Sequence, residues 1–133
     1  MNDQAIEQEI QAKGKTAPRV TPADIEANIA GEYYFTGDVA TSGPDVLKLS
    51  MEEKRAYPHT LQLSLLTFCV LVLRNGFTVT GESACASPEN FDAEIGRNIA
   101  RQNAVQKIWP LMGYALKDRL ANGQPADRGD GVL

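Results

Sequence analysis

The segment that most limits how this chain can fold is TFCVLVLRNGFTVTGESA, residues 67–84, in which two β-rich runs flank an Asn-Gly pair. Asn75-Gly76 suits the positive φ angles of a two-residue type I′ turn, so the sequence predicts a β-hairpin with strands at about 61–74 and 77–84. A two-residue turn also fixes the strand register. The expected opposite pairs are Arg74 and Phe77, Val72 and Val79, Val70 and Gly81, Cys69 and Glu82, and Phe68 and Ser83.

The two faces of this hairpin differ in polarity, because side chains alternate along a strand. The face that suits packing against a helix carries Phe68, Val70, Val72, Phe77 and Val79. The other face is half apolar and half polar, and carries Thr67, Cys69, Leu71, Leu73, Thr78, Thr80 and Glu82. A two-stranded sheet with both faces partly apolar cannot complete a core alone. We therefore expect further strands, with residues 60–66 as a candidate, or a partner subunit.

Two helix-start signals accompany the hairpin. Thr21-Pro22-Ala23-Asp24 places an N-cap before a proline and an acidic residue, which predicts a helix over 21–30 that Gly31 ends. Ser87-Pro88-Glu89-Asn90 predicts a second helix over 88–109.

Pro110 is expected to break this second helix, so that a third helix spans 111–121 and stops at Asn122-Gly123. The fold class that follows is α+β, with a small antiparallel sheet packed against helices.

The remaining segments read as less regular. Residues 1–18 are polar and charged, which predicts a mobile N-terminal arm or a short frayed helix, and the Gly- and Asp-rich residues 122–133 predict a disordered tail. Residues 32–58 read as a long loop, with a short helix near 49–55. The chain length leaves room for one domain, which we place at 19–121.

The second helix has two distinct sides at 100° per residue. One side carries Phe91, Ile95, Asn98, Gln102, Val105 and Trp109, and the opposite side carries Ala93, Gly96, Ala100 and Ala104. Buried among apolar neighbours, the amides of Asn98 and Gln102 would need hydrogen-bonding partners. Those partners are loop backbone, a second subunit, or a planar ligand such as a nucleobase.

Charge and hydropathy exclude several classes of protein. A net charge of −4 and a pI near 5.0 argue against DNA binding by phosphate neutralisation. The longest apolar run, residues 61–73, is too short and too polar to span a bilayer, and the first residues contain no apolar signal segment. We therefore expect no membrane association and a location in the cytoplasm.

A series of spaced motifs resembles the family of small phage proteins typified by gene 49 of phage N4 and gene 66 of phage Sf6. The resemblance covers about residues 20–120. The motifs are Val20-Thr21-Pro22, Ile25, Thr67-Phe68-Cys69, Asn75-Gly76-Phe77, Gly81-Glu82-Ser83-Ala84, Asn90-Phe91-Asp92, Gly96, Ala100, Ala104, Lys107-Ile108-Trp109 and Gly113-Tyr114. It implies a phage or prophage origin, so the cytoplasm would be that of the bacterial host. It implies no reaction and no catalytic residues.

Several polar residues are candidates for ligand binding. Glu82, expected opposite Cys69, has a setting that would desolvate a carboxylate, with hydroxyls from Thr67 and Ser83 nearby; a solvent-exposed or structural Glu is the alternative. Cations on the flanks of the second helix, together with aromatic rings at its end and in the third helix, suit phosphate contacts and base stacking, or else a solvated face with a core aromatic. These residues are Arg97, Arg101, Lys107, Trp109 and Tyr114.

The sequence contains no motif that is typical of metal binding or of a phosphate-binding loop. One His and two scattered Cys give no zinc-binding spacing, and the glycines form no phosphate-binding loop. We expect free thiols, no metal and no cofactor. An enzyme that pairs Glu82 with a hydroxyl or with His59 is the least supported hypothesis.

The favoured hypothesis is a non-enzymatic phage accessory protein that forms a homo-oligomer, a dimer or tetramer. It would bind a small host molecule and sequester a nucleotide-like anti-phage defence signal. The alternative is a protein-interaction module that binds and modulates a host enzyme through the 32–58 segment.

Overall fold

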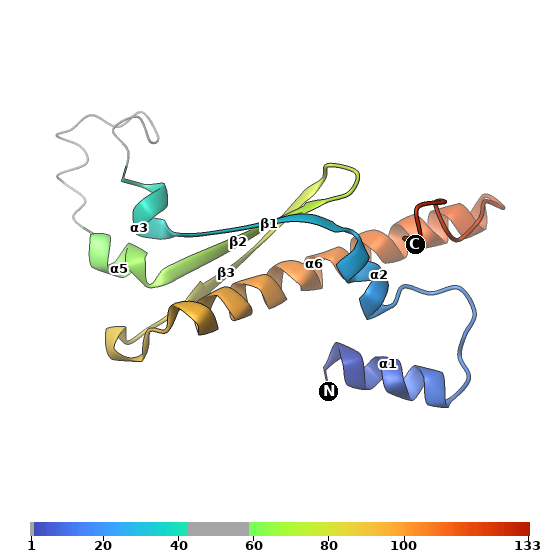
Figure 1. The fold of residues 1–133 in the computed structure, drawn as a ribbon, viewed down its shortest axis with the longest axis horizontal. Coiled ribbons are helices and arrows are strands. Elements are labelled where there is room, and N and C mark those ends of the chain that lie inside the picture. Colours follow the sequence, from blue (N-terminus) through green and yellow to red (C-terminus); the bar gives the residue numbers. More distant parts are fainter. Residues whose placement is uncertain (1, 43–58) are drawn as a thin grey trace.

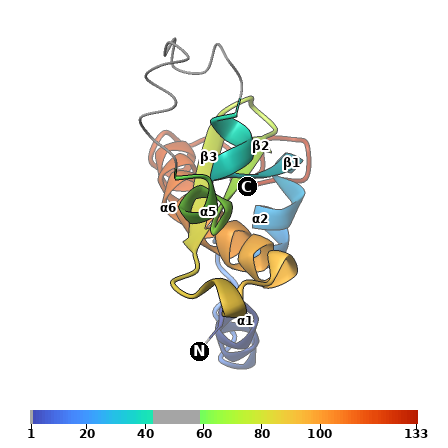
Figure 2. The same ribbon diagram turned by 90° about the vertical axis from the view of Figure 1, so that its left-hand side faces the viewer.

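The computed structural model describes residues 2–42 and 59–133 and confirms the α+β fold class. A three-stranded antiparallel sheet lies along one long helix (Figures 1 and 2). In chain order the elements are α1 (Asp3–Ala12), α2 (Pro22–Ala27), β1 (Ile29–Thr36), α3 (Gly37–Ala40), α5 (Thr60–Ser64), β2 (Leu66–Leu73), β3 (Thr78–Ala84), the 3₁₀ helix η2 (Pro88–Asn90) and α6 (Ala93–Ala121). The expected short helix near 49–55 lies outside the described residues.

The third strand of the sheet is β1, which pairs antiparallel with β2 in the order β1-β2-β3. Most of β1 lies in the segment predicted to be a long loop, so this prediction is wrong. The β-favouring run Tyr33-Tyr34-Phe35 outweighs the glycines on either side of it. Residues 60–64, the expected extra strand, instead form α5.

The hairpin is present, but its turn differs from the predicted one. Leu73 N donates to Phe77 O at 2.8 Å, and Gly76 N donates to Leu73 O at 2.9 Å. The connection is therefore a three-residue loop, Arg74–Gly76, in which Gly76 takes the positive φ of 87°.

The longer loop shifts the strand register by one residue from the expected pairing. The observed pairs include Val72 with Thr78, Cys69 with Gly81, Phe68 with Glu82, and Thr67 with Ser83.

The observed register and the position of α6 show that the two predicted faces of the hairpin have to be exchanged. The buried residues of β2 are Thr67, Cys69, Leu71 and Leu73, so the face predicted to be half polar is the one against the helix. Of the residues expected to pack on a helix, Val79 does so. Because side chains alternate, Phe68, Val70 and Val72 lie on the other face.

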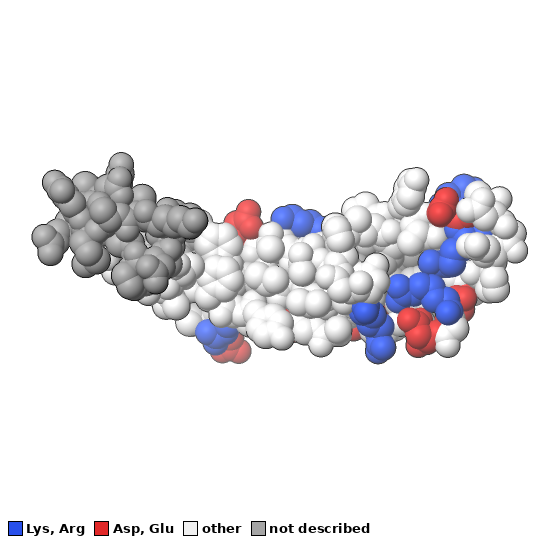
Figure 3. All heavy atoms as spheres, turned by 90° about the horizontal axis from the view of Figure 1, so that it is seen from above, with Lys and Arg blue, Asp and Glu red and all other residues white. Residues whose placement is uncertain are grey.

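That other face, which we call the open face, is turned away from α6. Its members on β1 and β2 are Tyr33, Phe35, Phe68, Val70 and Val72, and Glu82 lies beside Phe68 on β3. Tyr33 is 62% exposed, and the rings of Phe35 and Phe68 stack with centroids 5.2 Å apart. Seen from the sheet side, the middle of the molecule shows few charges (Figure 3).

The two predicted C-terminal helices form one helix, α6. It begins after Asp92, whose carboxylate accepts a hydrogen bond from Ile95 N at 3.0 Å, so it starts at residue 93 and not at 88. Pro110 lies within α6 and does not end it. Ile108 and Met112, on either side of the proline, are both buried in the core, and this packing outweighs the lost backbone hydrogen bond.

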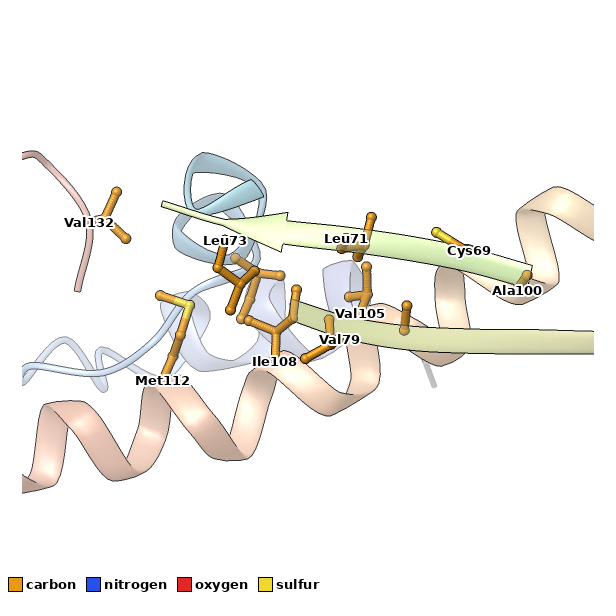
Figure 4. Packing of buried hydrophobic residues seen from close by; sticks show 11 residues of the cluster. Cys69, Leu71, Leu73, Val79, Ala100, Val105, Ile108, Met112 and Val132 are labelled. Atoms are coloured by element: carbon orange, nitrogen blue, oxygen red, sulfur yellow. The ribbon is translucent and has the colours of Figure 1, made fainter. Parts of the chain in front are cut away.

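The helix packs on the sheet through its small residues. Gly96, Ala100 and Ala104 are buried, and Gly81 of β3 lies directly against the backbone of α6. Larger side chains then close the core around this contact (Figure 4). The buried apolar cluster consists of Ile25, Cys69, Leu71, Leu73, Val79, Ala100, Ala104, Val105, Ile108, Met112 and Val132.

Residues near both ends of the chain pack against the rest of the protein. The predicted cap of the first helix is confirmed: Thr21 and Asp24 form a complete capping box at the start of α2. In the segment 122–133, expected to be a disordered tail, the chain turns back and Val132 is 1% exposed within the core. Part of the expected arm, residues 3–12, is the helix α1, and Glu7 binds Arg19.

We predict that Gly81→Ala strongly destabilises the protein. A Cβ at this position would overlap the carbonyl oxygen of Ala100 and the backbone nitrogen of Ala104, and neither can move without displacing α6. The expected loss in the free energy of unfolding is about 3 kcal/mol, measured by chemical denaturation.

Gly113→Ala is the matched control, because a Cβ there meets nothing within 4 Å and alanine favours a helix. It should stabilise the protein by up to about 1 kcal/mol. Equal effects of the two changes would contradict the close packing described for Gly81.

Candidate functional site

A large hollow lies between α1, α2 and α6, and we call it the α1–α6 hollow. Its volume is about 700 Å³, within the range of small-molecule sites. The residues that line it are Asn2, Asp3, Gln4, Ile6, Pro22, Ile25, Glu26, Asn98, Arg101, Gln102, Val105, Gln106 and Trp109. Four of them, Asn98, Arg101, Gln102 and Trp109, are among the ligand-binding residues predicted from the sequence.

The wall opposite α6 comes from α1. The indole Nε1 of Trp109 donates a hydrogen bond to Asp3 Oδ2 at 3.2 Å, and Gln106 Nε2 donates to the same oxygen at 3.3 Å. Asn2 caps α1 by accepting from Ala5 N. These contacts join the N-terminal segment to α6 and close one side of the hollow.

Asn98 and Gln102 do not have the buried setting expected for them. Both are exposed, because the buried side of α6 is the small-residue side. Their amide groups make no hydrogen bond to any residue in 2–42 or 59–133, and both line the hollow. These two amides are therefore available to a ligand that offers donors and acceptors.

Arg101 is already held by two carboxylates. Its guanidinium binds Glu26 through Nη1 at 3.0 Å and Nη2 at 2.7 Å, and it binds Glu32 through Nε at 2.7 Å. These hydrogen bonds lower the pKa of the Glu26 carboxyl and raise the pKa of Arg101. With two negative charges against one positive charge, the cluster is poorly suited to receive a phosphate.

A second hollow lies at the other side of this cluster, and we call it the Arg97 groove. It has a volume of about 270 Å³ and contains two further predicted site residues, Thr67 and Arg97. Tyr34, which also lines it, donates a hydrogen bond from its hydroxyl to Glu32 Oε2 at 3.0 Å. Burial and this bond raise the pKa of Tyr34 to about 12. The full lining is Tyr34, Phe35, Thr36, Val39, Thr67, Phe91, Ala93 and Arg97.

The other predicted site residues lie elsewhere. Glu82 is exposed and lies opposite Phe68, so the expected setting beside Cys69 is wrong, and Ser83 pairs with Thr67 within the sheet. Neither Lys107 nor Tyr114 lines either hollow, and Tyr114 is 77% exposed. The predicted residues are thus divided between two hollows and separate surface positions.

Sequence reasoning missed the acidic residues of the site. Glu26 and Glu32 come from α2 and β1, and only the packing of these elements beside α6 brings them to Arg101. Asp3 was assigned to a mobile arm, and no local pattern indicated its bond to Trp109.

Cys69 and Cys85 are free thiols, as expected, and burial raises the pKa of Cys69. Within residues 2–42 and 59–133, no His, Cys, Asp and Glu side chains gather as a metal site would require. No helix in the same part of the chain is long and apolar enough to cross a membrane.

Comparison with known proteins identifies a family. The sequence model of the phage protein (N4 Gp49/phage Sf6 gene 66) family matches residues 20–120. No curated protein and no solved structure matched the chain.

The ion pairs of Arg101 with Glu26 and Glu32 should make the free energy of unfolding depend on pH. Because the folded-state pKa of Glu26 is lowered, the stabilisation is present above the usual Glu value of about 4.3 and is lost as the pH falls through the folded-state value. We predict that Arg101→Gln lowers the free energy of unfolding at neutral pH. The difference from the unchanged protein should shrink as the pH falls from about 6 to about 3.

Urea denaturation at a series of pH values measures this difference. The pair of Lys13 and Glu9 on the surface of α1 provides the control, since Lys13→Gln should change stability little at either pH. A pH-independent effect of Arg101→Gln would show that the ion pair is not what stabilises this region.

Proposed function

Because this chain belongs to the phage protein family of N4 Gp49 and phage Sf6 gene 66, we propose that it is a phage accessory protein that binds a small host molecule without catalysing a reaction. The bound molecule would be sequestered in the α1–α6 hollow, within the cytoplasm of the bacterial host. We favour a nucleotide-like anti-phage defence signal as the ligand class.

The observation that carries this proposal is a pair of amides in the α1–α6 hollow that have no hydrogen-bonding partner within residues 2–42 and 59–133. Asn98 and Gln102 are one turn apart on α6 and face an open volume of about 700 Å³. An amide offers both a donor and an acceptor, which is what the edge of a nucleobase requires. Trp109, on the same side of α6, adds an aromatic surface to the hollow.

The proposal includes self-association into a dimer or tetramer. The open face supports it, because Tyr33 and Phe35 are exposed on a sheet face that carries little charge, although the chain as a whole has a net charge of −4. Two such faces can pack against each other as sheets do in a β-sandwich.

The alternative function is that of a protein-interaction module that binds and modulates a host enzyme. The same open face favours it, since exposed aromatic residues on a surface with few charges are typical of protein interfaces. Under this alternative, the open face would be occupied by a host protein and the hollow would remain unused.

Native mass spectrometry of the protein purified from a bacterial lysate distinguishes the two functions. The proposal predicts a homo-oligomer that carries a nucleotide-sized mass. A ligand-free monomer in complex with one host protein would support the alternative and would count against sequestration.

The contribution of the two amides is tested by the double change Asn98→Ala and Gln102→Ala. Both positions are exposed on a helix, so alanine should preserve the fold. A ligand held at 100 times its dissociation constant should stabilise the unchanged protein by about 2.7 kcal/mol in a thermal shift experiment. We predict that most of this stabilisation is lost in the double variant.

Gln62→Ala is the matched control, because Gln62 is an exposed amide on α5 and lines neither hollow. It should retain the full stabilisation. If the double variant binds the retained molecule as tightly as the control does, the α1–α6 hollow is not the binding site.

A further inference from the structure

The Arg97 groove differs in charge from the α1–α6 hollow. Arg97 is its only charged lining residue among those described, whereas the hollow contains Asp3, Glu26 and Arg101. Arg97 is exposed and forms no ion pair within residues 2–42 and 59–133. A free guanidinium without a neighbouring carboxylate in the lining is a good partner for an anion.

A hydroxyl group also lines the groove. Thr67 is 3% exposed, yet its side chain lines the groove and makes no hydrogen bond to any residue that the structure describes. A Cβ added at Gly96 would lie 3.0 Å from Thr67 Oγ1, so the absence of a side chain at Gly96 leaves this hydroxyl room. Because Thr67 lines the groove, its hydroxyl can donate a hydrogen bond to a ligand oxygen there.

The other walls are aromatic and helical. Tyr34 and Phe91 provide aromatic side chains against which a planar group can lie. Ala93 is the first residue of the 29-residue helix α6, whose N-terminus carries a partial positive charge. The volume of about 270 Å³ suits one planar ring with one small anionic group.

We propose that the Arg97 groove binds the phosphate-bearing end of a nucleotide, with Arg97 and the Thr67 hydroxyl on the phosphate and the base against the aromatic wall. Neighbouring residues of α6 line the two sites, since Asn98 contributes to the hollow and Arg97 to the groove. Glu32, held by Arg101 and Tyr34, belongs to the cluster between them.

This inference rests on the proposed function for the ligand class, but it concerns a different set of side chains. Adenosine 5′-monophosphate, adenosine and inorganic phosphate are the probes, titrated separately into the full-length protein and followed by backbone NMR. The nucleotide should shift the amide signals of Thr67 and of residues 93–97 more than those around Lys117, which lines neither hollow.

Variants identify which group holds the phosphate. Arg97→Gln should weaken the binding of adenosine monophosphate by about tenfold or more, because a charge-assisted hydrogen bond is lost, and should leave adenosine unaffected. Thr67→Val keeps the shape of the side chain and should weaken the binding of the nucleotide by a smaller factor than Arg97→Gln does. Lys117→Gln, which removes a charge from an exposed site on the same helix, should change nothing.

Three results would overturn the inference. The first is that no probe shifts the signals around the groove. The second is that Arg97→Gln weakens adenosine and its monophosphate equally, which would mean that the change acts on the fold and not on the phosphate. The third is that inorganic phosphate binds as tightly as the nucleotide, which would remove the role of the aromatic wall. If the proposed function of the α1–α6 hollow is wrong, a different result shows it: the Asn98 and Gln102 double variant then binds the retained molecule unchanged.

Discussion

The backbone of α6 lies against β3 at Gly81 with no side chain between them, and the rest of the structure depends on this contact. Ala100 and Ala104 allow the same close approach from the helix, so the helix lies along the sheet on its small-residue side. The side chains on the flanks of α6, among them Arg97, Asn98 and Gln102, then lie outside the core. Asn98 and Gln102 reach the α1–α6 hollow and Arg97 reaches the groove for this reason, and both sites follow from how the core packs.

Arg101 has a structural role where the sequence suggested a ligand contact. By binding Glu26 and Glu32, it connects α6 to both α2 and β1, and it brings an excess of negative charge to that region. The two sites therefore differ along α6. The amides of Asn98 and Gln102 line the hollow, whereas Arg97, which forms no ion pair within residues 2–42 and 59–133, lines the groove.

Local signals predicted the hairpin, the capping box at Thr21 and the small-residue side of α6, because each depends on neighbours in the sequence. The strand β1, the continuation of α6 through Pro110 and the burial of Val132 depend on tertiary packing, which outweighs local preference. At the site, residue types along α6 indicated the amides and the guanidinium groups. Their partners Asp3, Glu26 and Glu32 come from other elements, so only the fold shows which cation is engaged and which is free.

The three-residue loop Arg74–Gly76 has a consequence for how sequences of this kind can change over evolution. Deleting one loop residue would shift β3 by one position against β2, and every side chain of β3 would exchange faces. Gly81 would then leave the contact with α6, and a residue with a Cβ would replace it. Relatives that keep this helix packing should therefore vary in the residues of the loop but preserve its length, whereas insertions should accumulate in connections that set no register.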